Sequence, residues 1–168
     1  MIIHFGLHFD KGFFYDFGNS QEFENLVLGP IGLINYLEVL DEGFKPQEDK
    51  LSRLISYESE ISKVIYKYPE LSDSFESDSL AFASLFLKIR DWLKLNDLLR
   101  SECLKTNIRF NLISRIEKTN TVKGSLGDSL AGLKERISEI LKKHDLEIIC
   151  YEGLNDLPFY LKSVFEKI

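Results

Sequence analysis

The segment Ser79–Leu95 constrains the fold of this 168-residue chain more than any other feature. Apolar side chains occupy nearly its whole helical circumference: Leu80, Ala81, Phe82, Ala83, Leu85, Phe86, Leu87, Ile89, Trp92 and Leu93. A helix that is apolar on almost every side is usually buried. We therefore predict a helix at the centre of the core, buried on most sides and capped by Ser77 or Asp78.

Further helices are predicted where apolar residues recur at helical spacing. They cover the residues from Pro30 to Gly43, Lys50–Tyr68, residues 105–118, Asp128–His144 and the residues after Asp156. Asp156 is expected to cap the last helix, with Pro158 in its first turn. The acidic, serine-rich residues 70–78 are expected to form a solvated loop.

Short strands are predicted near the two ends of the chain and before the first helix. Apolar residues alternate from Ile3 to Phe9, which indicates a strand followed by a hairpin or a loop. Phe23–Leu28 and Leu146–Tyr151 are the other β-rich runs. We expect a helix-rich α/β fold in one domain, residues 1–168. A small, partly parallel sheet would be covered by about six helices.

Composition excludes some classes of function. The net charge is −6, which argues against a broad nucleic-acid-binding face, because phosphate binding depends on clustered Lys and Arg. Cys103 and Cys150 are isolated, so we expect two small buried apolar side chains rather than a disulfide or a zinc site. Without a signal sequence or a long apolar run, the expected location is the cytoplasm and no membrane contact is expected.

The glycines at Gly29-Pro30-Ile31-Gly32 lie at a predicted strand-to-helix junction, where phosphate can meet free backbone N–H groups. A nucleotide-binding loop of the Walker A type also needs a Lys followed by Ser or Thr. Both are missing here, and Pro30 removes one N–H. We therefore expect a tight structural turn and no bound cofactor.

The histidines give little support for a metal site. His4 and His8 would lie about 13 Å apart on one strand face, which is too far for one metal ion at about 3.3 Å per residue. We expect two half-exposed strand histidines, with His144 on the surface at a helix end. A hydrolase that combines His4 or His8 with acids of the 70–78 segment remains an alternative.

Arg90, Asp91 and Trp92 stand out because two charges interrupt the most apolar helix. A buried Arg must be paired, and Glu38 or Glu117 is the expected partner. Such a pair would orient helices. The alternative is that Glu38, Arg90, Asp91 and Trp92 contact a partner protein or a phosphate backbone.

The order of these motifs resembles a known family. The residues that carry the resemblance are Leu28–Leu33 leading to Leu37-Glu38, Arg53 and Tyr57, Ser74–Asp78, Ala83, Phe86-Leu87, Arg90-Asp91, Ile113–Glu117 and Leu157-Pro158. In this order they are similar to the N-terminal region of large bacterial proteins of the PD-(D/E)XK nuclease family, such as the AddB component of the ATP-dependent helicase–nuclease AddAB. The pattern spans nearly the whole chain.

The resemblance implies a degenerate helicase-type α/β domain at the start of a longer DNA repair protein. The family's nuclease motif and its iron–sulfur or metal chemistry lie far downstream, so no catalytic residue carries over to this chain. The chain departs from the family at Asn96-Asp97, where Gly-Trp is usual. The implied function is a non-catalytic scaffold domain in an AddB-like component of an ATP-dependent exonuclease.

The expected partner is the remainder of that parent protein or a helicase subunit, with DNA reached only through the parent. The alternative is a stand-alone protein-interaction module. An apolar final helix that runs to Ile168 also favours a missing partner.

Overall fold

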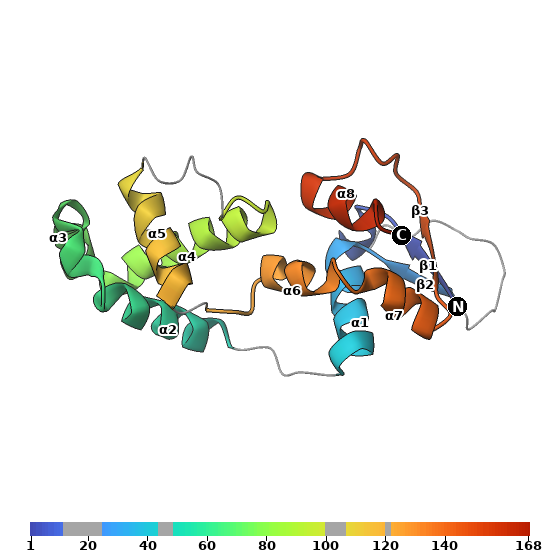
Figure 1. Ribbon diagram of the computed structural model, residues 1–168, viewed down its shortest axis with the longest axis horizontal. Coiled ribbons are helices and arrows are strands. Elements are labelled where there is room, and N and C mark those ends of the chain that lie inside the picture. The colour runs from blue at the N-terminus through green and yellow to red at the C-terminus, as the bar shows by residue number, and fades with distance from the viewer. Residues whose placement is uncertain (12–24, 44–48, 100–106, 120–121) are drawn as a thin grey trace. The chain divides into compact units, whose positions relative to one another are not determined.

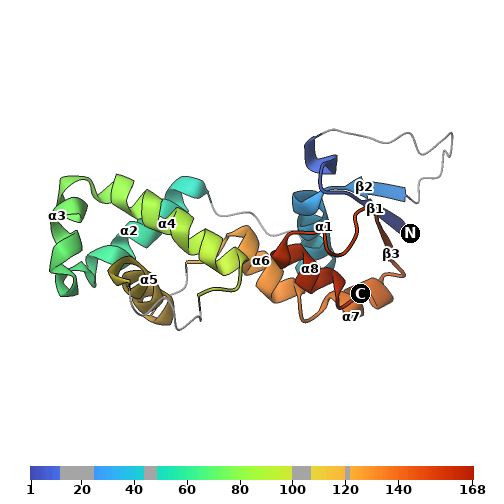
Figure 2. The ribbon, with the colours of Figure 1, turned by 90° about the horizontal axis from the view of Figure 1, so that it is seen from above.

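The computed structural model describes residues 1–11, 25–43, 49–99, 107–119 and 122–168. The chain divides into two compact units. The α/β unit comprises Met1–Lys45 and Ser129–Ile168, and the helical unit comprises Pro46–Asp128. Figures 1 and 2 show the elements of each unit. The helical unit is thus an insertion in the sequence of the α/β unit, and a single domain across residues 1–168 stays a prediction.

The α/β unit contains a parallel sheet. Its elements are β1 (Ile2–Phe5), a 3₁₀ helix η1 (Phe9–Lys11), β2 (Asn25–Leu28), α1 (Pro30–Glu42), α7 (Ile137–Lys143), β3 (Glu147–Cys150) and α8 (Phe159–Phe165). The strand order is β2-β1-β3, and both pairs are parallel. Phe5 is in register with Leu28 and Cys150. The described strands therefore confirm a small parallel sheet in a helix-rich α/β fold.

One face of the sheet forms the core of this unit. Ile3 and Phe5 point to that face from the central strand and are fully buried. The Phe5 ring lies 4.9 Å from the ring of Phe165 on α8. Figures 1 and 2 show α1, α7 and α8 on the same side of the sheet. Parallel strands need helical crossovers, which explains why helices follow β2 and precede β3.

The first strand is shorter than its alternating pattern predicts. β1 ends at Phe5, and the Phe9 N–H donates to the carbonyl of Gly6 at 3.2 Å, which closes a turn. A Cβ on Gly6 would lie 2.9 Å from the Phe9 ring, so the turn depends on a residue without a side chain. The alternation from Ile3 to Phe9 is therefore a strand and a turn, and β2 pairs in parallel rather than as a hairpin.

The helical unit contains α2 (Lys50–Ser62), a 3₁₀ helix η2 (Ile65–Lys67), α3 (Pro69–Ser77), α4 (Ser79–Leu95) and α5 (Ile108–Thr119). Its core includes Tyr57, Ile61, Phe75, Phe82, Phe86, Leu112, Ile113 and Ile116. Phe82 stacks on Phe86 with 4.2 Å between the ring centroids. A last helix, α6 (Leu126–Leu133), begins at the end of this unit.

The prediction for α4 is right in position and wrong in burial. The helix spans Ser79–Leu95, and the Asp78 carboxylate accepts the Ala81 N–H at 2.9 Å, which confirms the cap. However, Leu85 and Trp92 are 51% and 57% exposed. The helix is buried along one side only, because α2, α3 and α5 pack there.

Three other boundaries differ from the sequence predictions. The 70–78 segment is mostly helix α3, because Leu71 and Phe75 lie one turn apart and are both buried. The predicted helix Asp128–His144 is interrupted between α6 and α7, where the Arg136 N–H turns back to the Leu133 carbonyl. Asp156 does not cap α8, whose N-cap is Pro158. The described residues therefore form eight α-helices rather than about six.

None of the helices in the described part of the chain combines the length and the hydropathy needed to cross a membrane. Cys150 is half-buried with a free thiol, while Cys103 lies outside the described residues. Burial raises the pKa of the Cys150 thiol, which favours its protonated form.

Candidate functional site

The start of α1 is the position where an α/β protein of this kind could bind a phosphate. Here the carboxylate of Asp10 occupies it. The Ile31 N–H donates to Asp10 Oδ2 at 2.7 Å and the Gly32 N–H donates to Asp10 Oδ1 at 3.1 Å. These are the backbone donors that a phosphate would use, so the site holds an internal anion.

Glycine makes this approach possible. A Cβ on Gly29 would lie 2.3 Å from the backbone nitrogen of Asp10. Only a residue without a side chain can let η1 come so close to the strand-to-helix turn. The sequence correctly excluded a Walker A loop, but it did not identify Asp10, which is 21 residues away from Ile31. Asp10 also contributes, after burial, to raising the pKa of Tyr160 on α8.

The crevice between β1 and β3 is the second position where such sheets bind ligands. The chain moves from β1 to β2 on one side and later to β3 on the other, so the order reverses at this crevice. The Leu7 N–H, just beyond β1, donates to Glu152 Oε1 at 2.7 Å. The Tyr151 N–H, just beyond β3, donates to the Phe5 carbonyl at 3.1 Å. The Glu152 carboxylate thus accepts a hydrogen bond from a backbone N–H at this crevice, as the Asp10 carboxylate does at the start of α1.

The histidines do not meet at this edge. His4 lies on β1, and its Nδ1 is 2.9 Å from the Tyr151 hydroxyl. His8 follows the strand, lies in a turn and is exposed, so the prediction of two strand histidines is wrong for His8. The described residues contain no group of three side chains that could hold a metal ion.

The acidic residues of the 70–78 segment belong to the helical unit, on and after α3. Glu70, Asp73 and Glu76 are exposed, and Asp78 caps α4. His4 and His8 belong to the α/β unit. The hydrolase alternative, which needs a histidine and these acids within hydrogen-bond reach, stays a prediction.

Arg90 lies at the centre of the most charged cluster of the helical unit. Its side chain is 0% exposed. The guanidinium binds both carboxylate oxygens of Asp128, with Nη1 at 2.7 Å from Oδ2 and Nη2 at 2.8 Å from Oδ1. Its Nε donates to Glu117 at 2.9 Å and Nη1 donates to Asp91 at 3.1 Å. We call Arg90, Asp91, Glu117 and Asp128, together with Arg53 and Ser125, the Arg90 cluster.

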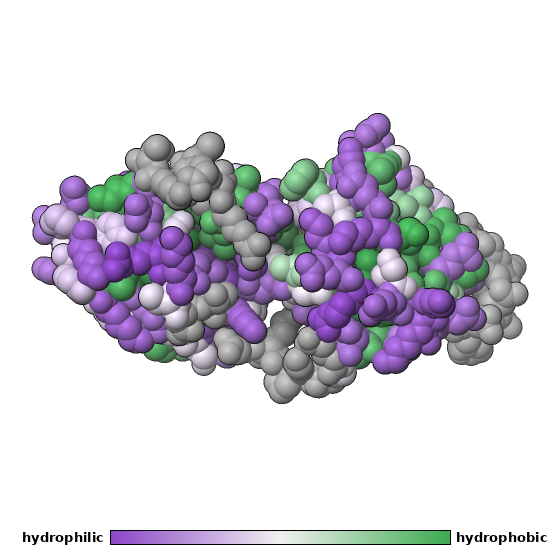
Figure 3. Space-filling view, viewed as in Figure 1, coloured by the Kyte–Doolittle hydropathy of each residue, from purple (hydrophilic) through white to green (hydrophobic). Residues whose placement is uncertain are grey.

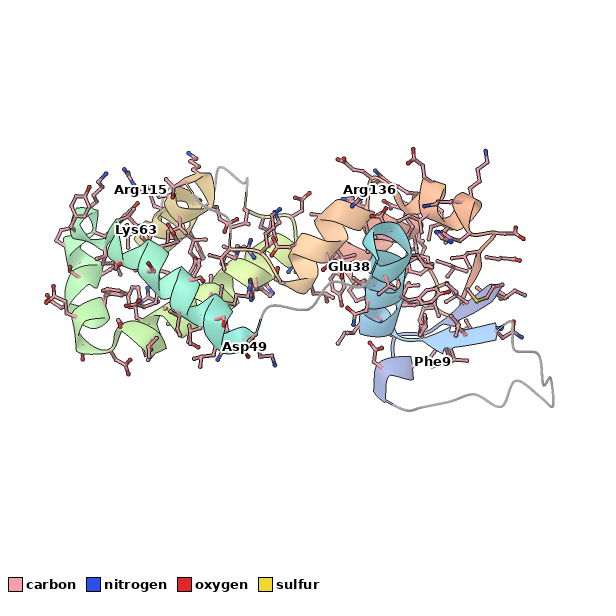
Figure 4. The ribbon with its side chains drawn as sticks, turned by 90° about the horizontal axis from the view of Figure 1, so that it is seen from below. Phe9, Glu38, Asp49, Lys63, Arg115 and Arg136 are labelled. Carbon is pink, nitrogen blue, oxygen red and sulfur yellow. The ribbon has the colours of Figure 1, made fainter. Side chains whose placement is uncertain are left out.

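The partners of Arg90 resolve one of the sequence predictions. Of the two expected partners, Glu117 on α5 binds Arg90. Glu38 lies on α1 of the α/β unit (Figure 4) and is not among the hydrogen-bond or ion-pair partners of Arg90. The sequence did not identify Asp128, the partner that makes the two-point contact. The only sequence feature that could have identified Asp128 is Ser125, three residues before it, because a serine followed at this spacing by an acid is typical of a helix start.

Ser125 and Asp128 form a capping box at the start of α6. The Asp128 N–H donates to Ser125 Oγ at 3.1 Å, and the Ser125 N–H donates to Asp128 Oδ2 at 3.1 Å. Gly127 brings this turn against the end of α4, where an added Cβ would lie 2.6 Å from the Leu95 nitrogen. One carboxylate, that of Asp128, therefore both caps the start of α6 and pairs with the buried Arg90 guanidinium.

Asp91 and Trp92 have different roles from Arg90. The Asp91 carboxylate accepts from Arg53 Nη1 at 2.7 Å, and Arg53 Nε donates to the Lys123 carbonyl at 2.7 Å. Arg53 therefore ties α2 to α4 through Asp91 and to the segment before α6 through the Lys123 carbonyl. Trp92 points outward and is largely exposed.

The electrostatics agree with a structural role for the cluster. Burial alone would lower the pKa of the Arg90 guanidinium, but the hydrogen bonds that it donates to Asp128 and Glu117 outweigh burial and raise that pKa. Burial would raise the pKa of the Asp128 carboxyl, but bonds from Arg90 and Ser125 lower it. Burial raises the pKa of Tyr57, with a smaller contribution from Glu117. With the donors of Arg90 engaged and its side chain buried, the cluster offers no cation to a phosphate.

The comparisons with known proteins found no match. No family model, no curated protein and no solved structure matches the chain. The function must therefore be inferred from the sequence motifs and the geometry.

Proposed function

We propose that the chain is a non-catalytic, helicase-like scaffold domain of a DNA-processing helicase–nuclease. The motif order that resembles the N-terminal region of AddB-type proteins is the basis for the class of protein. The proposal that the domain is non-catalytic depends on one observation: the Asp10 carboxylate accepts hydrogen bonds from the Ile31 and Gly32 N–H groups at the start of α1. A motor domain needs those donors, a lysine and a hydroxyl for its nucleotide.

One further feature supports this proposal. The α/β unit has parallel strands with a strand–glycine–helix junction between β2 and α1, as a degenerate motor domain would have. The Asn96-Asp97 pair after α4, where the family has Gly-Trp, is a departure from the pattern and gives the proposal no support.

Calorimetric titration of the full chain with Mg-ATP tests the proposal. We expect no binding tighter than about micromolar. The Asp10→Ala variant exposes the donors at the start of α1 and is expected to bind no better than millimolar, because Lys and the hydroxyl are still missing. Affinity of the unmodified chain for ATP tighter than about micromolar would contradict the proposal.

A second candidate, a stand-alone interaction module, is favoured by the exposed side of α4. Leu85 and Trp92 lie seven residues apart on that side and are both about half exposed. Figure 3 shows one face of the surface, on which hydrophobic residues reach the solvent among hydrophilic ones in the helical unit. Clustered exposed apolar residues are typical of interaction sites.

The two candidates differ in their partner. Trp92 is the only tryptophan. Its fluorescence therefore reports directly on whether another segment or a partner protein buries this side of α4. If the open reading frame continues past Ile168 into a nuclease-bearing protein, the emission of Trp92 should shift to the blue in that longer protein. A stop codon after Ile168 would favour the module. An unchanged emission in the longer protein would show that its added part leaves α4 uncovered.

A further inference from the structure

The helical unit carries a local basic surface. The unit has as many acidic as basic residues, so the net charge of −6 resides in the α/β unit. Within the helical unit, exposed cations gather on α5 and at the end of α2. We call Lys63, Lys67, Arg115 and Lys118, together with Tyr66, the basic surface. A local surface of this kind can attract a polyanion even where the charge of the whole chain opposes a broad binding face.

The exposed charges of α5 are all basic. Its three basic side chains face the solvent, whereas its one acid, Glu117, is turned inward and binds Arg90 at 2.9 Å. Asn111, Arg115 and Lys118 follow one another by four and three residues, so they line one side of the helix. Within the part of the chain that the structure describes, neither Arg115 nor Lys118 belongs to an ion pair. Both cations are therefore available to a ligand.

A second group of cations lies at the end of α2 and on η2. Lys63 and Lys67 are exposed, and Tyr66 between them is 69% exposed. The Lys67 ammonium lies 5.2 Å from the centroid of the Tyr66 ring. Lys63 pairs with Glu60 at 2.6 Å but stays largely exposed, and such an exposed pair holds its partners weakly. An exposed aromatic ring beside cations is typical of surfaces on which nucleic-acid bases stack.

The two groups of cations belong to one surface, because η2 and α5 contribute to the same core. The Tyr68 hydroxyl donates to Asn111 Oδ1 at 3.0 Å, which fixes the end of η2 beside the outward side of α5. α2 also packs against α5. Figure 4 shows Lys63 close to Arg115 across these two helices. One ligand can therefore reach cations from both groups.

The chemistry of the basic surface fits a single-stranded nucleic acid. Its phosphates recur along the strand, so cations on two neighbouring elements can contact successive phosphates. An acidic peptide or an anionic membrane would also meet the cations, but neither carries flat bases that stack on an exposed ring. We propose that the basic surface binds single-stranded nucleic acid, with its four cations at the phosphates and Tyr66 stacked on a base.

Fluorescence anisotropy tests the proposal, with a labelled oligo(dT) strand of about 20 nucleotides titrated with the full chain. We expect binding at low salt with a dissociation constant of about 10–100 μM. Each phosphate contact on a single strand contributes about −0.7 to the slope of log affinity against log salt concentration. Four contacts should therefore give a slope of about −3.

Charge variants show whether the basic surface is the binding site. The double variant Arg115→Gln with Lys118→Gln should weaken binding by at least about tenfold and reduce the magnitude of the salt slope by about 1.4. Lys142→Gln with Lys143→Gln makes the same charge change at exposed positions of α7, in the α/β unit. This matched control should leave binding unchanged. All four positions are exposed, and circular dichroism confirms that each variant is folded.

A stacking variant separates a single strand from a backbone alone. Tyr66→Ala should weaken oligo(dT) binding by at least about fivefold. The salt slope should stay the same, because the substitution removes no charge. Binding of a blunt duplex of the same length should not respond to Tyr66→Ala, because paired bases are not free to stack on the ring.

Four results would overturn the proposal. The first is an anisotropy that does not change at low salt, even at millimolar chain concentration. The second is an equal loss of binding in the α7 control. The third is full oligo(dT) binding by Tyr66→Ala. The fourth is displacement of the strand by polyglutamate as effectively as by unlabelled oligo(dT), which would indicate an acidic protein segment. Neither ATP binding nor a parent protein enters these tests, so this proposal and the scaffold function fail separately.

Discussion

The starts of α1 and α6 are stabilised by the same kind of side chain in two different settings. At α1, Asp10 comes from a distant segment and accepts only backbone N–H groups, in bonds that are exposed to solvent. At α6, Asp128 belongs to the helix itself and also binds the fully buried guanidinium of Arg90. The difference teaches that the partner's burial, more than the number of bonds, decides how much each carboxylate matters.

The largest effect is expected for Asp128→Ala. The substitution leaves the Arg90 charge buried without its two-point partner, so the unfolding free energy should fall by about 3–5 kcal/mol. Urea unfolding measures it. Asp73→Ala, an exposed acid on α3, is the matched control and should change stability by less than about 0.5 kcal/mol. If both variants lose the same amount, the Arg90 cluster does not have the role that its burial indicates.

Adding Arg90→Met to Asp128→Ala sharpens this test. Methionine removes the buried charge that has lost its two-point partner and fills the space, so the double variant should be more stable than Asp128→Ala alone.

Acid should remove the contribution that the Asp128 carboxylate makes to stability. The folded state lowers the pKa of this carboxyl from its usual 3.8. Its contribution is therefore fully present above pH 3.8 and is lost as the pH falls through the lower folded-state value. Unfolding free energies measured across this acid range should fall less steeply for Asp128→Asn than for the unmodified chain. Parallel curves would contradict the assignment.

Two glycines of α6 should respond in opposite directions to alanine. At Gly127 the new Cβ would lie 2.6 Å from the Leu95 nitrogen, so Gly127→Ala should lower stability by about 1–3 kcal/mol. At Gly132, which is exposed, the nearest atom is the mobile end of Arg136 at 3.4 Å. Gly132→Ala should therefore raise stability, by up to about 1 kcal/mol. Thermal unfolding of both variants checks the contrast.

At α1 the expected effect is smaller. Asp10→Ala removes two bonds to backbone N–H groups that water can partly replace, so it should lower stability by about 1 kcal/mol. Asp49→Ala is the control, because Asp49 precedes α2 but makes no capping bond through its side chain. A loss as large as that of Asp128→Ala would remove the distinction between the two helix starts.

The smallest effect is expected at the end of α4, where no carboxylate is bound. Asp97 has a φ of 55°, and the Leu98 N–H returns to the Leu93 carbonyl at 2.8 Å. Glycine adopts this conformation without steric penalty, so Asp97→Gly should raise stability by roughly 0.5–1 kcal/mol. A lower melting temperature for this variant would mean that the Asp97 side chain contributes more than its backbone strain removes.

Local patterns predicted most elements, and they failed where a pattern has two interpretations. Apolar spacing identified α4 to its last residue, because a long periodic run outweighs other signals. The run from Ile3 to Phe9 alternates like a strand, yet Gly6 lets the chain turn after Phe5. The acidic composition of the 70–78 segment predicted a loop. The segment forms α3 because Leu71 and Phe75, one helical turn apart, are buried on one side of it.

The candidate sites were less predictable than the fold. Glu117 was one of two named partners for Arg90, whereas Asp128 and Asp10 were not identified. Asp10 and Ile31 are 21 residues apart, and Arg90 and Asp128 are 38 apart. No local spacing rule links residues at such separations, since only the packing of the elements brings them together.

The sequence by itself determined the helix-rich α/β class, the position of α4 and the absence of a Walker A motif. Each of these depends on residue types at short spacing. Tertiary structure alone decided that Asp10 would occupy the start of α1 and that Asp128 would bind Arg90. The physical reason is that hydrogen bonds and ion pairs depend on distance and burial in space, which the order of residues along the chain does not specify.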